Sequence, residues 1–168
     1  PDHPSLMPEI LAKHTSMPVH QAEEGQIVQA NHVYLIPPKK ELAIQDRRLH
    51  LNARSLSRGV YLPIDTFFKS LAREKKQEAI GVVLSGSGSD GSRGAMAIKE
   101  AGGMVMIQDP ESAEFESMPR SVFATKSADF VLEPEQMPEL LLDFIHHRPR
   151  METPVPLEEM TDEQHYQR

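Results

Sequence analysis

The amino-acid sequence predicts an α/β fold with a doubly wound, mainly parallel sheet and one antiparallel hairpin. In the second half of the chain, short unbroken apolar runs alternate with segments of helical spacing, the pattern of parallel strands joined by crossover helices. In the first half, two short segments alternate apolar and polar residues, which indicates a hairpin with one face in water. Turns that contain glycine or proline end most of these segments.

Each element follows from its local pattern. Leu6, Ile10 and Leu11 have helical spacing. The β-branched and aromatic residues of 32–36, followed by Pro37, predict a strand. The elements expected in the first half are a helix over 4–15, a strand over 32–36, hairpin strands over 41–44 and 48–51 joined by 45–47, and a helix over 63–73. Those expected in the second half are strands over 79–84, 104–107 and 129–132, and helices over 92–101, 118–124 and 134–147.

The end of the chain differs from the rest. Residues 148–168 contain three prolines and many charged residues without apolar periodicity, which indicates a tail or linker. We therefore expect one domain over 1–147 and a tail or linker over 148–168.

Composition and charge limit the function. The net charge of −7 argues against a protein that binds duplex nucleic acid, because such proteins need a basic face. The chain has no cysteine, which excludes disulfides and thiolate chemistry. No apolar run approaches the length needed to cross a membrane, so we expect a cytoplasmic protein without membrane insertion.

A glycine- and serine-rich turn over 85–91 follows the apolar run of 79–84 and contains Asp90. In an open α/β sheet, functional groups gather beyond the carboxyl ends of the strands, so this turn is the first candidate for a site. Its three glycines let the backbone bend tightly, and Asp90 precedes the helix expected over 92–101. A carboxylate there can cap that helix or hold the ring of a histidine.

Two other functions fit the same turn. Asp90 can be a helix cap and nothing more, which is the commonest role of an aspartate before a helix. The glycines also form a Gly-x-Gly-x-x-Gly pattern, typical of phosphate-binding loops, with Asp109 as the acidic residue that a dinucleotide ribose would need. No Lys-Ser or Lys-Thr pair follows the glycines, so the turn is not a Walker A loop.

Several motifs, in order along the chain, make the sequence resemble the chemotaxis receptor methylesterases of the CheB type. The similarity extends from residue 1 to about residue 145. The sequences of 32–38 and 63–71 are most similar to those of hybrid proteins, which join this domain to a receptor methyltransferase and sensor domains. The residues that carry the resemblance are 31–38, 63–65, 81–91, Gly94, 101–103, 108–113, Phe115 and 118–120.

The resemblance implies that Asp90 is the acid of a Ser/His/Asp triad in a serine-type carboxylic ester hydrolase, a protein-glutamate methylesterase. Such enzymes hydrolyse glutamate methyl esters on methyl-accepting chemoreceptors and release methanol, and some also deamidate glutamine. The triad carboxylate holds the histidine in the right tautomer and stabilises the imidazolium that forms. The resemblance implies no cofactor and no metal.

The family's other two triad residues have no match in this chain. The family's serine lies in a Gly/Ser/Thr-rich turn after its first strand, and its histidine belongs to a Gln-His pair. The resemblance places both before residue 1, so the N-terminal strands of the family fold are expected to be absent. His3, His14 and His20 do not match that histidine, and we expect all three to be exposed to solvent on a helix or loop.

The serines of the Asp90 turn do not replace the missing nucleophile. Ser85 and Ser89 crowd Asp90, but no base is expected within reach of them. Ser87 stands where the family usually has methionine, which changes the contacts around the oxyanion and the substrate.

The missing strands have structural consequences, because the family places them in the middle of its sheet. We expect a sheet edge to open and apolar faces around Val82 and Val105 to lose neighbours. We expect the chain alone to be inactive on an ester and to form oligomers or exchange strands. The alternative function is a non-catalytic docking or regulatory module of a hybrid chemotaxis protein.

Two smaller features remain. Arg120, in the Met-Pro-Arg turn of the resemblance, either contacts an acidic receptor surface or marks the start of a helix. His146 and His147 are adjacent on a predicted helix and point in different directions, which argues against a shared metal site.

Overall fold

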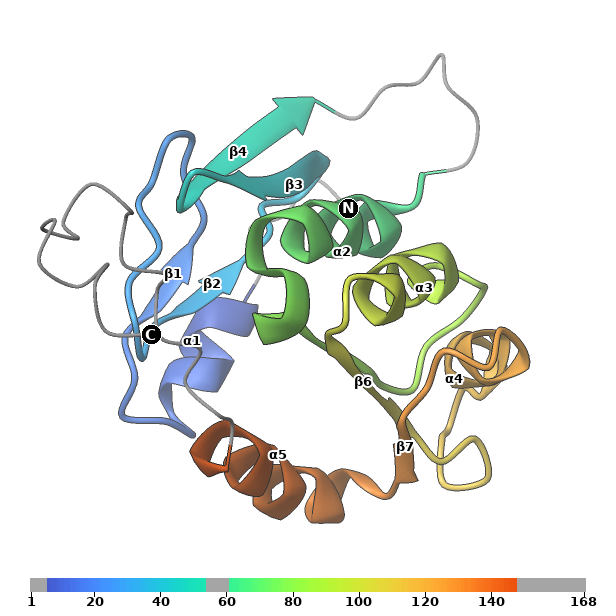
Figure 1. Cartoon of the computed structure of the whole chain (residues 1–168). Helices are drawn as coiled ribbons and strands as arrows, with labels where there is room; N and C mark the ends of the chain where they lie inside the picture. The colour runs from blue at the N-terminus through green and yellow to red at the C-terminus, as the bar shows by residue number, and fades with distance from the viewer. Residues whose placement is uncertain (1–5, 54–60, 148–168) are drawn as a thin grey trace, which may run out of the picture. The chain divides into compact units, whose positions relative to one another are not determined.

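The computed structural model describes residues 6–53 and 61–147, and the chain divides into two units between Met137 and Pro138. In the first unit, the described strands form three sheets (Figure 1). Two of these sheets are parallel and one is an antiparallel hairpin, so the predicted α/β class is confirmed. The predicted tail, 148–168, lies outside the described residues.

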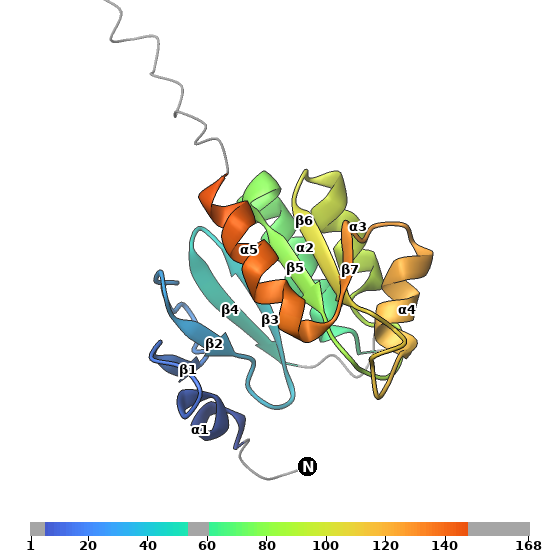
Figure 2. The ribbon, with the colours of Figure 1, turned by 90° about the horizontal axis from the view of Figure 1, so that it is seen from below.

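The largest sheet is parallel and consists of β5 (Ile80–Val83), β6 (Met104–Gln108) and β7 (Phe130–Leu132), with β6 in the middle. The three strands lie side by side in Figure 2. Between them the chain forms α3 (Ser92–Glu100) and α4 (Ser117–Ala124). The predicted alternation of strands and helices over this half is therefore confirmed.

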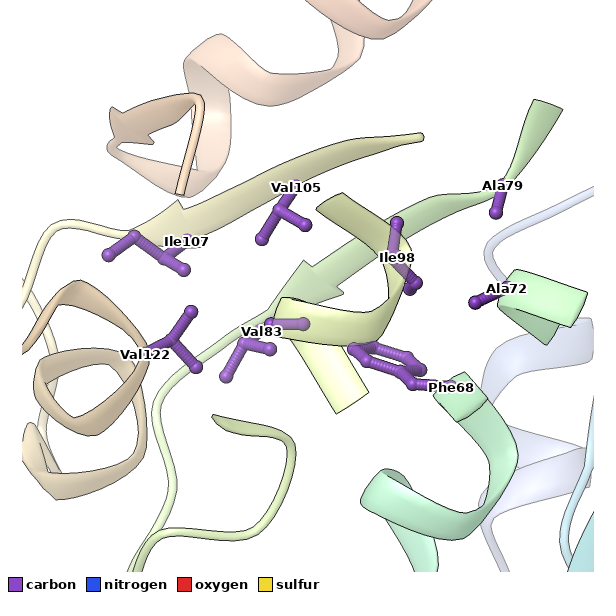
Figure 3. Packing of buried hydrophobic residues seen from close by; sticks show 9 residues of the cluster. Phe68, Ala72, Ala79, Val83, Ile98, Val105, Ile107 and Val122 are labelled. Carbon is purple, nitrogen blue, oxygen red and sulfur yellow. The ribbon is translucent and has the colours of Figure 1, made fainter. Parts of the chain in front are cut away.

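One face of this sheet packs against three helices, α2 (Pro63–Lys75), α3 and α4 (Figure 3). Each helix contributes at least one buried side chain, and β5 and β6 supply the strand side of the core. The buried members of this cluster are Phe68, Ala72, Ala79, Val83, Ala95, Ile98, Val105, Ile107 and Val122.

The expected effects of an open sheet edge are seen at Val82 but not at Val105. Among the described residues β5 pairs only with β6, so β5 is an edge strand, and Val82 is 38% exposed. Val105 is fully buried, so the expectation for this residue was wrong. Val105 lies in the central strand, where helices cover it whatever lies beyond β5.

The chain begins with a short helix and a small parallel sheet. α1 (Met7–Ala12) is shorter than predicted and has no buried residue. β1 (Val19–Gln21) pairs in parallel with β2 (Val33–Leu35), the strand that the sequence predicted. β1 was not predicted, because its three residues do not alternate and only the pairing with β2 defines it as a strand.

The predicted hairpin is formed by β3 (Lys40–Gln45) and β4 (Arg48–Ala53). Its tip consists of Asp46 and Arg47, both left-handed with φ of 50° and 59°. The Glu74 carboxylate, near the end of α2, accepts their two N–H groups at 3.1 and 2.9 Å. Leu42, Ile44 and Leu49 are buried on one face, as the alternating pattern predicted.

The end of the described chain is helical. Short 3-10 turns lie at Lys76–Glu78 and Pro134–Gln136, and the second of them leads into α5 (Met137–His146). α5 therefore begins three residues later than the helix expected over 134–147. No helix within 6–53 and 61–147 is long and apolar enough to cross a membrane.

Candidate active site

The carboxylate of Asp90 lies in the turn after β5 and binds the start of α2. Its Oδ2 accepts the N–H of Ile64 at 3.0 Å, and its Oδ1 accepts the N–H of Asp65 at 2.9 Å. These two groups are among the first four N–H groups of a helix, which have no partner inside the helix. Asp90 therefore caps a helix that is distant in sequence, and the cap of α3 that the sequence suggested is not formed.

Gly91 explains why the Asp90 carboxylate caps α2 and not α3. It occupies the N-cap position of α3 with φ of 94° and offers no side chain to cap that helix. A Cβ at this position would lie 3.0 Å from Cγ2 of Ile64. A glycine therefore satisfies two demands, the left-handed backbone and the close approach of the turn to α2.

A second carboxylate, that of Asp65, connects the same two helices in the opposite direction, from α2 to α3. Asp65 lies in the first turn of α2, is 3% exposed, and its Oδ1 accepts the N–H of Gly94 in α3 at 2.7 Å. Its Oδ2 is buried and has no hydrogen-bond partner within the part of the chain that the structure describes. Sequence reasoning missed this residue. The available signal was an acidic residue two positions after Pro63, which is typical of a helix start.

The Asp90 turn is fastened to the segment that leads into α4. The N–H of Gly86 donates to the Phe115 carbonyl at 2.9 Å, and the Gly86 carbonyl accepts the N–H of Met118 at 3.0 Å. The Ser117 hydroxyl accepts the N–H of Gly88 at 2.9 Å. Two motifs of the resemblance, the glycine turn and the Met-Pro-Arg turn, are therefore adjacent in the structure.

Gln108 fixes the beginning of the same turn. Its side chain is buried at the end of β6, and its Oε1 accepts the N–H of Ser85 at 2.9 Å. Its amide nitrogen donates to the carbonyl and hydroxyl oxygens of Ser112, both at 3.3 Å. The Ser85 hydroxyl in turn accepts the N–H of Phe115 at 2.9 Å. The carboxyl ends of β5 and β6 are thus joined by side chains.

These contacts argue against a phosphate-binding loop. Such a loop needs free backbone N–H groups, whereas those of Gly86 and Gly88 are bound to Phe115 and Ser117. The Asp109 carboxylate accepts the N–H of Glu111 in a local turn. Two of the N–H groups that a phosphate-binding loop would offer are therefore already bound, and the Asp90 carboxylate of the same turn binds α2.

No histidine within 6–53 and 61–147 hydrogen-bonds Asp90 or a serine of its turn. His3 lies outside the described residues, and His14 is exposed as expected. His20 is half-buried in β1, so the expectation of an exposed histidine was wrong there. Its ring stacks on the rings of His32 and Tyr34, with centroids 5.2 and 5.5 Å apart.

An apolar cavity of about 660 Å³ lies in the first unit. Val82 of β5 lines it together with side chains of β2 and of α2. Among the described residues, β2 pairs only with β1 and β5 only with β6, so each of these strands has an unpaired edge. The residues that line the cavity are Val28, Tyr34, Leu35, Ile36, Leu42, Leu49, Pro63, Ile64, Phe67, Phe68 and Val82.

An ion pair lies at the start of α4, whose first turn is bonded to the glycine turn. Arg120 forms an ion pair with Glu116 one helical turn away, at 2.6 Å, and this hydrogen bond raises the pKa of the Arg120 guanidinium. Both side chains are more than half exposed. Among the described residues, no three histidine, aspartate or glutamate side chains are grouped so that they could hold a metal ion.

Comparison with known families gives a match over most of the chain. The family model described as CheB methylesterase matches residues 1–141. This range contains Asp90 and the glycine turn. It also contains the starts of α2 and α3, which the Asp90 and Asp65 carboxylates connect by hydrogen bonds.

Two relatives illustrate the range of similar proteins. A Rhodobacter capsulatus protein, described as a 104.1 kDa protein in the hypE 3′ region, is 42% identical over 145 residues, which are 86% of this chain and 15% of that protein. The Myxococcus xanthus protein-glutamate methylesterase/protein-glutamine glutaminase 1 is 34% identical over 118 residues, which are 68% of this chain and 34% of that protein. The chain thus spans only about a third of the length of one of these relatives and about a seventh of the other.

The three-dimensional comparison agrees. The crystal structure of the Thermotoga maritima CheB methylesterase catalytic domain is similar with a TM-score of 0.76 and 29% sequence identity. The similar region covers 84% of this chain and 79% of that chain.

Proposed function

Because the chain belongs to the CheB methylesterase family, we propose that it forms part of a protein-glutamate methylesterase site and that Asp90 is the triad acid. The observation that carries this proposal is the double hydrogen bond that fixes the Asp90 carboxylate beyond the carboxyl end of β5. Functional groups of α/β sheets gather at this end of the strands.

The geometry of Asp90 suits the role. A carboxylate has about four acceptor positions on its two oxygens, and the N–H groups of Ile64 and Asp65 occupy one on each oxygen. The remaining positions are available for a histidine ring N–H. The backbone donors hold the carboxylate in place, so it can fix the tautomer of that histidine and stabilise the imidazolium.

The proposed reaction is the hydrolysis of a glutamate methyl ester on a chemoreceptor. A serine hydroxyl attacks the ester carbonyl while the histidine takes its proton, and the histidine then returns that proton to the departing methanol. Water hydrolyses the acyl-enzyme by the same route and leaves a free glutamate. With glutamine as the substrate, the leaving group is ammonia.

We further propose that the serine and the histidine come from residues outside this chain. Two observations support this. No described histidine reaches Asp90, and residues of β2 and β5, which each have an unpaired edge among the described residues, line an apolar cavity. Strands added at these edges would cover Val82 and close the open edge.

A hybrid protein is the proposed context. The Rhodobacter capsulatus relative supports it, because the matching segment is a small part of a 104.1 kDa protein. In this proposal, residues 1–147 are the methylesterase-like domain and 148–168 are a linker toward a receptor methyltransferase or sensor domain. The partner is a methyl-accepting chemoreceptor and the location is cytoplasmic.

The alternative is a non-catalytic docking or regulatory module of such a hybrid. The absence of a histidine partner for Asp90 among the described residues favours it. Methanol release from methylated receptor separates the two functions when the complete gene product and the 168-residue chain are compared. We expect activity in the complete product and none in the chain alone. A complete product that folds, binds the receptor and releases no methanol supports the module.

A further inference from the structure

Asp65 is a buried acid that the proposed reaction does not use. Its side chain is 3% exposed, and its Oδ1 accepts the N–H of Gly94 at 2.7 Å. Its Oδ2 is buried without a hydrogen-bond partner among the described residues. A buried acceptor without a partner lowers stability, so a native protein that keeps one calls for an explanation.

The two carboxylates join the same two helices in opposite directions. Asp90 precedes α3 and binds the first N–H groups of α2, whereas Asp65 belongs to α2 and binds a first-turn N–H group of α3. A movement that separates the two helix starts therefore stretches both connections at the same time.

The helices approach closely where Asp65 binds. A Cβ added to Gly94 would lie 2.5 Å from the Cβ of Phe68 and 3.1 Å from the Cα of Asp65. The backbone of α3 thus contacts α2 directly, and the hydrogen bond from Gly94 to Asp65 sets the relative position of the helices along this contact.

We propose that Asp65 is a positioning residue for Asp90. By holding the start of α3 against α2, Asp65 keeps the turn before α3 in place, and that turn carries the carboxylate of Asp90. The catalytic consequence rests on the proposed function, whereas the connection between the two helix starts is a property of the chain itself.

Amide hydrogen exchange in the 168-residue chain tests this connection. The N–H of Ile64 donates to Asp90 and not to the side chain of residue 65. In D65A, we expect this N–H to exchange at least about tenfold faster beyond any change in global stability, the size of a lost helix cap. The matched control is V122A, since Val122 is fully buried in the same core but lies in α4. In V122A, exchange at Ile64 follows the global change only.

The reverse variant keeps the proposal testable if D65A does not fold. In D90A, we expect the N–H of Gly94 to exchange faster by a similar factor, although Asp90 does not bind it. If Ile64 in D65A and Gly94 in D90A change no more than in V122A, the two caps are independent and the proposal is overturned.

Kinetics of the complete gene product separate this proposal from the proposed function. We expect D65A to lower kcat and leave KM nearly unchanged, because Asp90 orients the histidine and does not bind the receptor. Coupled exchange together with an unchanged kcat overturns the positioning role. Coupled exchange in a protein whose wild-type form has no esterase activity supports the connection and contradicts only the proposed function.

Discussion

The backbone N–H of Asp65 donates a hydrogen bond of 2.9 Å to Oδ1 of Asp90, which joins the start of α2 to the turn that follows β5. The same bond stabilises a helix end and fixes a carboxylate at the end of the sheet where functional groups gather. A helix cap and a triad acid are therefore compatible roles of one residue, and the predictions below separate their contributions.

Removal of the Asp90 carboxylate should destabilise the fold. D90A leaves the N–H groups of Ile64 and Asp65 without their acceptor, and we expect a loss of about 1–2 kcal/mol in the free energy of unfolding. D90N keeps one acceptor oxygen and should lose less. Urea denaturation of the 168-residue chain measures both. The matched control is D46N, because asparagine tolerates the left-handed backbone of Asp46. A loss in D90A no larger than in D46N contradicts the cap.

Gly94 should not tolerate alanine. In an exposed helix, glycine to alanine gains roughly 1 kcal/mol. In G94A the new Cβ would meet Phe68 at 2.5 Å, so we expect a loss of about 1–3 kcal/mol instead. R93A, at the neighbouring exposed position of α3, should change stability by less than about 0.5 kcal/mol. Thermal unfolding of both variants tests the sign, and a stabilised G94A would disprove the close approach of α2 and α3.

Glu74 should stabilise the hairpin tip. Its carboxylate satisfies the N–H groups of Asp46 and Arg47, two residues in a left-handed conformation that non-glycine residues rarely adopt. We expect E74A to lower the free energy of unfolding by about 1 kcal/mol. E78A removes an exposed carboxylate just beyond the helix and should be close to neutral. Equal effects of the two substitutions would rule out a specific contact at the tip.

Glu24 should make stability depend on pH. The N–H of Leu51 and the ring of His50 donate to its carboxylate, and these hydrogen bonds lower the pKa of Glu24 below its usual range. The stabilisation is complete above the pKa of Glu24 in the unfolded chain and is lost as the pH falls through the lower pKa of the folded state. Between about pH 6 and about pH 3, the urea midpoint of E24Q should therefore fall less than that of wild type. If the urea midpoints of E24Q and wild type fall in parallel as the pH decreases, Glu24 does not contribute to the pH dependence of stability.

The sequence predicted the second half of the fold well for a physical reason. Unbroken apolar runs separated by helical patterns leave few alternatives to a parallel sheet, and β5, β6 and β7 occur where expected. β1 was not predicted because three residues are too few to show an alternation of apolar and polar side chains. Only the pairing of Val19 with Val33 makes it a strand.

The candidate site was only half predictable. Asp90 stands after an apolar run in a glycine turn, which a single sequence reveals. Its partner Ile64 is 26 residues away, and no local pattern reports a contact between a turn and a distant helix start. Asp65 resembled an ordinary acidic residue in a first helical turn, because only the approach of Gly94 buries it.

The central claim is that Asp90 is the acid of a methylesterase triad, and its most direct test is methanol release from methylated chemoreceptor by the complete gene product carrying D90N. We expect kcat to fall on the order of 10⁴-fold, as happens when a triad carboxylate becomes an amide and the histidine adopts the wrong tautomer. D46N, the matched control, should retain wild-type turnover. A D90N protein that is folded and turns over like wild type would contradict the assignment of Asp90.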